Sequence, residues 1–127
     1  MQKKTKKPWG GRFKDDLDPL VQKYTSSLNI DRRLADYDIR GSRAHVRMLA
    51  TQGIIQSEDE ELILKGLKQI EKEIQTGEFP YREELEDIHM NIEYRLQEIV
   101  GQAGHRLHTG RSRNDQVCLD IRLYLRD

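Results

Sequence analysis

Apolar side chains recur at every third or fourth position along most of this chain, which is the spacing of an amphipathic helix rather than of a strand. The clearest case begins with Ser57-Glu58-Asp59-Glu60, which matches a capping box, and ends at Gly77, a residue type that favours helix ends. Its apolar positions are Ile63, Leu67, Ile70 and Ile74. This stretch predicts a helix with one buried face.

The run from Asp31 to Gly53 predicts another helix, with Asp31 as its N-cap. Its apolar residues form two stripes, Leu34, Tyr37, Gly41, Ala44 and Met48 on one side and Ala35, Ile39, Val46 and Ala50 on the other. A helix with two apolar stripes has neighbours on two sides. Gly41 costs about 1 kcal/mol relative to alanine, which is tolerable where another backbone passes close. The short connection after Gly53 predicts a helical hairpin.

Two further stretches have helical spacing. One has apolar residues Leu85, Ile88, Ile92, Leu96 and Ile99 and ends at Gly101. The last follows Thr109, which we expect to be its N-cap, so that Gly110 to Arg113 form the first turn before Val117, Ile121 and Tyr124. Upstream, Asp18-Pro19 opens a short helical stretch, whereas Leu28-Asn29-Ile30 is strand-like. The pattern as a whole predicts an all-α fold.

Composition narrows the class of protein. A length of 127 residues allows one domain, and 35% apolar residues with a mean hydropathy of −0.85 indicate a small or shared core. The 22 basic and 22 acidic side chains give no net charge, which argues against nucleic-acid and membrane surfaces as partners. A lysine-rich start without an apolar segment behind it, and a single cysteine, predict a soluble cytoplasmic protein. Cys118 is expected to be a packing thiol.

The segment from Gly104 to Cys118 concentrates charges and donors at the predicted start of the last helix. Free backbone amides and the helix dipole favour an anion there, and Arg111 and Arg113 add guanidinium groups that suit a carboxylate or phosphate. Ser112 and Asn114 supply neutral donors. The alternative is a solvated helix start whose arginines pair with surface acids.

Metal and nucleotide cofactors find little support in the sequence. Glu86, His89 and Glu93 are spaced to line up on one helix face, but one imidazole with two carboxylates is a weak metal motif, and an oriented or charge-paired histidine is the better interpretation. Phosphate-binding glycine motifs, a nucleophile elbow and zinc spacings are all missing from the sequence. We therefore predict no metal and no cofactor.

Several blocks resemble argininosuccinate lyase of the fumarase/aspartase superfamily. The strongest is Leu107-His108-Thr109-Gly110-Arg111-Ser112-Arg113-Asn114-Asp115-Gln116, ten consecutive residues that are similar to the first signature block of that family. The others are Trp9-Gly10-Gly11-Arg12-Phe13, Asp36-Tyr37-Asp38-Ile39, Gly41-Ser42-Arg43-Ala44-His45 and Glu86-Asp87-Ile88-His89-Met90-Asn91-Ile92-Glu93. One departure is Gly104-His105-Arg106, where the family commonly has a second small residue and a lysine.

The resemblance implies reversible β-elimination of argininosuccinate to arginine and fumarate, in arginine biosynthesis, by a homotetramer without a cofactor. It implies that Ser27, Asp87, His89, Ser112, Arg113 and Asn114 bind the substrate. The proton-transferring groups lie in later family blocks, so no catalytic residue is assigned to this chain. It also implies the organisation: 1–14 a flexible tail and N-terminal arm, 15–110 a helical N-terminal domain, and 111–127 the truncated start of a central-bundle helix.

Family members are several times longer than this chain, so we expect the chain to be inactive alone. Two non-catalytic alternatives stay open. One is a recruited structural protein like delta-crystallin, and the other is a helical interaction module. Fumarase, aspartase and adenylosuccinate lyase share the chemistry, but the Trp9 to Phe13 block and the Arg111 to Gln116 block favour the argininosuccinate branch.

Overall fold

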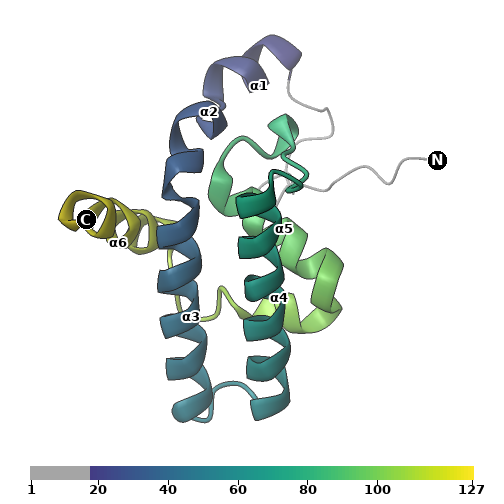
Figure 1. Ribbon diagram of the computed structural model, residues 1–127, viewed down its shortest axis with the longest axis vertical. Helices are drawn as coiled ribbons and strands as arrows, with labels where there is room; N and C mark the ends of the chain where they lie inside the picture. Colours follow the sequence, from purple (N-terminus) through teal and green to yellow (C-terminus); the bar gives the residue numbers. More distant parts are fainter. Residues whose placement is uncertain (1–17) are drawn as a thin grey trace.

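The computed structural model describes residues 18–127, and all of their regular structure is helical (Figure 1). In chain order the elements are α1 (Pro19–Thr25), α2 (Leu28–Asp31), the 3₁₀ turn η1 (Arg32–Leu34), α3 (Ala35–Thr51), α4 (Ser57–Thr76), η2 (Glu83–Leu85), α5 (Ile88–Val100), η3 (Gly101–Arg106) and α6 (Arg113–Arg126). The all-α prediction is confirmed for this part of the chain. The predicted tail 1–14, with the Trp9 to Phe13 block, lies outside the described residues.

Helices α3 and α4 form the predicted antiparallel hairpin, and α5 packs against α4 (Figure 1). Gly77 ends α4 in the left-handed conformation, with φ of 75°, as its position predicted. The core between these helices is made of fully buried aliphatic side chains: Ile39, Val46, Ile63, Leu67, Ile70, Ile88, Ile92 and Leu96. Their burial is the main stabilising contribution to the fold.

Helix α6 lies on the opposite side of α3 from α4 (Figure 1). It approaches α3 at Gly41, where a Cβ atom would lie 3.0 Å from Leu119 Cδ2. Next to this contact the rings of Tyr37 and Tyr124 meet edge to face, with centroids 5.8 Å apart. The prediction that α3 has neighbours on two sides is confirmed, although Met48, of the same stripe as Tyr37 and Gly41, is 42% exposed.

Two predictions about the first part of the chain were wrong. Leu28 to Ile30 belong to α2 and are not a strand. Asp31 does not cap α3, because its carboxylate accepts hydrogen bonds from Ser27 Oγ at 2.6 Å and from the backbone amide of Ile88 at 3.1 Å. The local sequence predicted Asp31 as the N-cap of the helix that follows it. In the structure its carboxylate instead joins α2 to α5.

Three expectations about α4 and α6 also need correction. The capping box at Ser57 does not form, because the N-cap of α4 is Gln56 and makes no side-chain hydrogen bond. Helix α6 starts at Arg113 with Ser112, not Thr109, as its N-cap. Cys118 is exposed and is therefore not a packing thiol.

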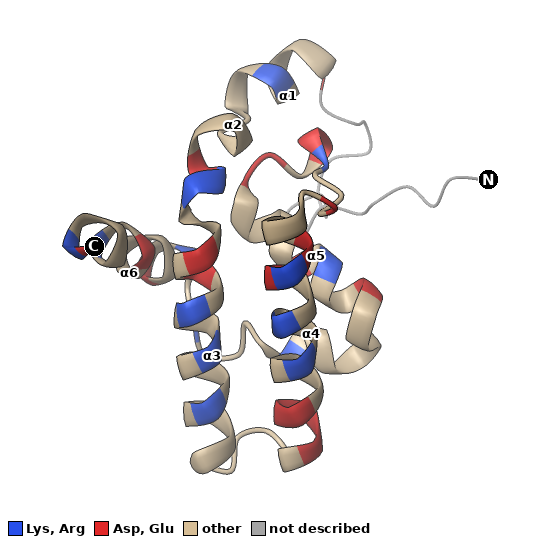
Figure 2. Ribbon diagram, in the orientation of Figure 1, with Lys and Arg blue, Asp and Glu red and all other residues tan. Residues whose placement is uncertain are grey.

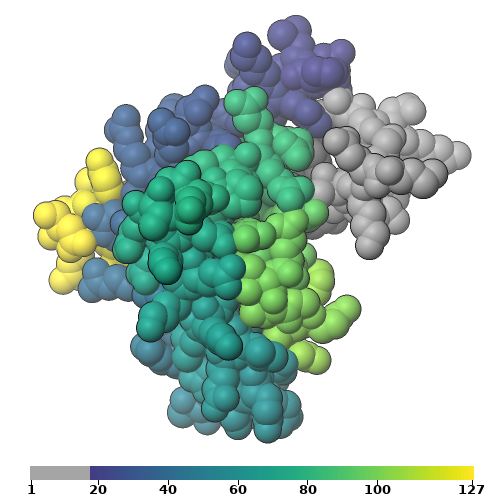
Figure 3. Space-filling view, turned by 45° about the vertical axis from the view of Figure 1, so that its right-hand side comes forward, coloured from purple at the N-terminus to yellow at the C-terminus, as the bar shows by residue number. Residues whose placement is uncertain are grey.

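Basic and acidic residues are interspersed along the helices (Figure 2). Arg43 pairs with Glu71 at 2.7 Å between α3 and α4, and Arg95 pairs with Glu73 at 2.8 Å between α5 and α4. Partly exposed pairs of this kind contribute roughly 0–1 kcal/mol each. In the space-filling view α4 and α5 form one continuous surface, with the end of α6 projecting at its edge (Figure 3). Among the described helices none is long and apolar enough to cross a membrane.

Candidate functional site

The N-terminal end of α5 brings together segments that are distant in sequence. Asp87 is the N-cap of α5, and its carboxylate accepts a hydrogen bond from the Met90 amide at 2.7 Å. Burial raises the pKa of Asp87, while the Met90 hydrogen bond and the electrostatic interactions with His89 and Arg113 limit the rise. Asp87 is therefore a half-buried carboxylate at a helix start, within the electrostatic reach of the arginine that begins α6.

Ser27 lies beside this helix start although it is far away in the chain. Its backbone amide donates to the carbonyl oxygen of Glu86 at 2.9 Å, and its hydroxyl donates to Asp31, which accepts from the Ile88 amide. Glu86 has a positive φ of 69°, a strained conformation for a residue with a side chain. The hydrogen bonds to the Glu86 carbonyl hold that strained turn, and such turns concentrate at functional sites.

His89 is buried, with 3% of its surface exposed, and its ring faces two aspartates from other helices. Nδ1 lies 3.0 Å from Asp38 Oδ1 of α3 and 3.3 Å from Asp120 Oδ2 of α6. Gln116 donates from Nε2 to the same Asp38 oxygen at 2.5 Å. Burial acts to raise the pKa of Asp38, but its interaction with His89 and the hydrogen bonds with Asp120 and Gln116 lower it overall. We call Asp38, His89, Gln116 and Asp120 the buried polar cluster.

Arg113, the first residue of α6, bridges this cluster to the surface. Its Nη1 donates to Gln116 Oε1 and its Nη2 to Glu93 Oε2, each at 2.6 Å. Ser112 caps the helix by accepting from the Asn114 amide at 3.2 Å, and both of these residues are exposed. The start of α6 therefore presents neutral donors to solvent, next to an arginine that already holds a carboxylate.

The loop before α6 is fixed by contacts with α3. His45 Nε2 lies 2.8 Å from the Thr109 carbonyl oxygen, and Arg111 donates from Nη1 to Ser42 Oγ at 3.2 Å. Burial lowers the pKa of Arg111, which is partly offset by the negative charge of Asp38. The alternative, in which Arg111 and Arg113 pair with surface acids, holds in part. Arg113 pairs with the partly exposed Glu93, whereas Arg111 donates to Ser42.

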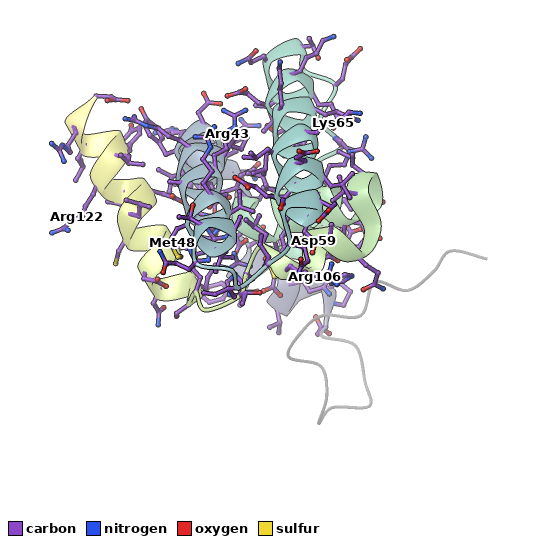
Figure 4. The ribbon with its side chains drawn as sticks, turned by 90° about the horizontal axis from the view of Figure 1, so that it is seen from below. Arg43, Met48, Asp59, Lys65, Arg106 and Arg122 are labelled. Carbon is purple, nitrogen blue, oxygen red and sulfur yellow. The ribbon has the colours of Figure 1, made fainter. Side chains whose placement is uncertain are left out.

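Arg106 belongs to Gly104-His105-Arg106, the segment in which this sequence departs from the family pattern. Figure 4 shows Arg106 and Asp59 pointing toward one another from η3 and α4, and Arg106 Nη1 lies 2.6 Å from Asp59 Oδ1. This cation therefore anchors η3 to the start of α4.

The six residues predicted to bind substrate separate into two groups. Ser27, Asp87, His89 and Arg113 gather around the first turn of α5, and Ser112 and Asn114 lie exposed at the start of α6. The predicted alignment of Glu86, His89 and Glu93 is wrong, because Glu86 precedes α5 and His89 turns into the core while Glu93 pairs with Arg113. The substrate-binding role of all six residues stays a prediction.

Sequence reasoning gave no role to Asp38, Gln116 or Asp120. Their spacing carried a usable pattern, because Asp38 and Ser42 lie one helical turn apart, as do Gln116 and Asp120. Polar pairs at that spacing, within stretches that also carry apolar stripes, point to a polar contact between two helices. Nothing in the sequence indicated that Asp38 and Asp120 would meet at His89.

Asp38, His89 and Asp120 each offer a ligand atom, and these atoms lie within 4.8 Å of one another. One imidazole and two carboxylates suit a divalent cation in composition. The donors already present argue for a different arrangement, because Gln116 Nε2 is directed at Asp38 and the cations Arg111 and Arg113 interact with Asp120. A hydrogen-bonded cluster fits these neighbours better than a metal centre.

Comparison with known proteins decides the family. The family model described as Lyase matches residues 11–127, which include every element of the site. The chain belongs to this lyase family.

Its similarity to individual lyases is high. It is 61% identical over 121 residues to argininosuccinate lyase of Geobacter metallireducens, a match that covers 95% of this chain and 26% of that protein. It is 58% identical over 123 residues to argininosuccinate lyase of Nitrosomonas europaea, covering 97% of this chain and 27% of the relative. The lyase chain thus spans about a quarter of the length of the curated relatives that it matches.

Proposed function

We propose that this chain supplies substrate-carboxylate binding in an argininosuccinate lyase, which cleaves argininosuccinate reversibly to arginine and fumarate. The observation that carries the proposal is the meeting of Arg113 with the N-terminal turn of α5, in a chain 61% identical to argininosuccinate lyase of Geobacter metallireducens over 121 residues. The reaction is inferred from the name of the similar proteins, argininosuccinate lyase. The geometry supplies fixed donors of the type that the reaction needs.

The chemistry explains why donors matter. β-Elimination removes a weakly acidic proton next to a carboxylate, and the resulting carbanion is stabilised as an aci-carboxylate with extra negative charge on its oxygens. Positioned donors that face this charge lower the barrier without reorganising during the reaction. We assign this role to Arg113, Asn114, Ser112 and Ser27, with Asp87 and His89 beside them. The groups that remove and return the proton are not assigned to residues of this chain.

We further propose that the working form is a homotetramer in the cytoplasm, and that 111–127 begins a bundle helix shared between subunits. The support is the exposed apolar surface of α6, where Ile121 is 43% and Leu125 76% exposed. Apolar side chains gathered on one exposed helix face favour association.

A chimera tests the function directly. This chain would replace the matching 121 residues of the Geobacter metallireducens enzyme, and fumarate release would be followed by absorbance. We expect the chimera to retain kcat/KM within about tenfold of the parent, and the chain alone to release no fumarate. A folded, tetrameric chimera without activity would contradict the proposal. That outcome would favour the second candidate, a helical interaction or structural protein like delta-crystallin, to which the exposed α6 face is equally suited.

A further inference from the structure

The buried polar cluster contains more acceptor oxygens than donors. Both oxygens of Asp120 and Oδ2 of Asp38 are buried and have no hydrogen-bond partner among the described residues. Asp120 Oδ2 lies 3.3 Å from His89 Nδ1, but the hydrogen-bond contact of Nδ1 is with Asp38 Oδ1, 3.0 Å away. An ionised carboxylate in such a place costs several kcal/mol unless another group pairs with it.

A proton on Asp120 pairs two of these three oxygens with groups of the cluster alone. If Asp120 carries a proton, its hydroxyl donates to the unpartnered oxygen of Asp38, and one shared proton accounts for both carboxyl groups. Two carboxylates held this close do not both ionise, as in other carboxyl dyads. Burial, followed by the charge of Asp38 and the hydrogen bond with it, raises the pKa of Asp120 to about 9.

The charged groups around Asp38 and Asp120 are consistent with a single negative charge on these two carboxyl groups together. The positive charges of Arg111, in the loop before α6, and of Arg113, its first residue, oppose the rise of the Asp120 pKa without reversing it. From α5 the facing group is His89, and from α3 it is Asp38. One negative charge on Asp38 therefore balances the half-buried Arg111, while Arg113 is balanced by Glu93.

The two carboxyl groups also determine the orientation of the neighbouring side chains. Arg113 donates to Gln116 Oε1, which leaves the Gln116 amide group to donate from Nε2 to Asp38. The same Asp38 oxygen accepts from His89 Nδ1. A continuous hydrogen-bonded path thus joins Arg113 to His89 through Gln116 and Asp38.

We propose that Asp38 and Asp120 are positioning residues: they share one proton, hold the His89 proton on Nδ1, and leave Nε2 as the atom that His89 offers to a substrate. The last part rests on the proposed function, since it assumes that His89 contacts the substrate. The first part concerns the chain alone. It assigns a role to two carboxyl groups outside the predicted substrate-binding set, through the residues that they orient and not through contact with reacting atoms.

The shared proton is tested by infrared spectroscopy on the 127-residue chain. We expect a protonated-carboxyl C=O band between about pH 5 and 8, well above the ordinary pKa of an aspartate, and its loss in Asp120→Asn. Asp120→Asn should stay folded by circular dichroism, because an amide keeps the donor. Asp115→Asn, an exposed acid in the same helix, is the matched control and should keep the band. A wild-type chain without the band would overturn the proposal. Loss of the band on adding one equivalent of Zn²⁺ would also overturn it, in favour of a metal site.

The histidine is tested by ¹⁵N nuclear magnetic resonance of the same samples. We expect the His89 proton on Nδ1 in the wild type and in Asp120→Asn, and its redistribution toward Nε2 in Asp38→Ala. If Asp38→Ala unfolds, the wild-type spectrum still decides, because a proton confined to Nε2 would contradict the proposal. Added fumarate should move the Nε2 resonance and not Nδ1. Failure of fumarate to bind would count against the proposed function alone, since the infrared and tautomer results need no substrate.

Discussion

Arg113 of α6 and Glu93 of α5 form an ion pair in which Nη2 lies 2.6 Å from Oε2. The arginine that the sequence predicts to hold a substrate carboxylate therefore already holds one from its own chain. A guanidinium has several donors, so Glu93 either competes with the substrate for Arg113 or orients it. The two roles predict opposite effects of removing the Glu93 charge.

We expect competition, so Glu93→Gln should tighten fumarate binding. The side chains of Arg113 and Glu93 are 29% and 26% exposed, and pairs of this kind contribute about 0.2–1 kcal/mol, which corresponds to roughly a 1.5- to 5-fold gain in affinity. Isothermal titration with fumarate measures it. Glu98→Gln is the control, because Glu98 pairs with Arg82 and Arg95 on another surface. Weaker binding by Glu93→Gln would show that Glu93 orients the arginine.

Asn114→Ala should impair catalysis without unfolding the protein. Asn114 is exposed at the first turn of α6, and losing one positioned donor typically costs about 2–4 kcal/mol of transition-state stabilisation. The measurement is kcat/KM of the chimera, with Gln75→Ala, an exposed amide near the end of α4, as control. If kcat/KM of Asn114→Ala stayed within about threefold of the parent, Asn114 would not belong to the substrate site.

The free energy of unfolding should fall as pH rises, because Asp120 holds a proton in the folded chain. Its pKa is raised to about 9 in the folded chain, so between the ordinary aspartate pKa of about 4 and that value the folded chain binds a proton that the unfolded chain has lost. By linkage, this contribution to stability is full at low pH and is lost as pH rises through that range. Urea unfolding at about pH 5 and pH 8 measures it. Asp120→Asn should remove this part of the slope, and an unchanged slope would show that Asp120 is ionised in the folded chain.

Gly66→Ala should destabilise the fold although alanine is the better helix former. A Cβ at Gly66 would lie 2.6 Å from Leu96 Cδ1 and 2.9 Å from Val100 Cγ1, and Leu96 is fully buried. Overpacking of this kind costs roughly 1–3 kcal/mol, against a gain of about 1 kcal/mol in helix propensity. Gly41→Ala should cost less, because its neighbour at 3.0 Å is the end of the Leu119 side chain, which is 44% exposed. The urea midpoints of the two variants decide, and equal or raised stability of Gly66→Ala would contradict the packing argument.

The chain should associate through α6. Ile121 and Leu125 are 43% and 76% exposed on its outer face, so Ile121→Glu with Leu125→Glu should lower the mass measured by light scattering. Thr76→Glu, an exposed change at the far end of α4, should leave the mass unchanged. A strictly monomeric, stably folded wild-type chain would exclude this face as an interface.

The sequence by itself determined the longer helices and most of their buried faces, because those depend on local spacing. The α3–α4 hairpin, the Gly77 stop and the close approach at Gly41 all follow from apolar periodicity and the special conformations of glycine. The sequence was less informative about where each helix starts. Asp31 and Thr109 both had the chemistry of an N-cap, and the choice between such residues depends on which backbone amides the tertiary fold leaves unpaired.

Only the tertiary structure decided which polar groups meet. Asp38, His89 and Asp120 come from α3, α5 and α6, and no local pattern relates residues so far apart in the chain. Their meeting depends on how α6 crosses α3 at Gly41, a geometry set by side-chain packing between the helices. The charge of Asp120 depends in turn on that meeting, because burial beside Asp38 favours its protonated form, whereas the same residue in an unfolded chain is ionised at neutral pH.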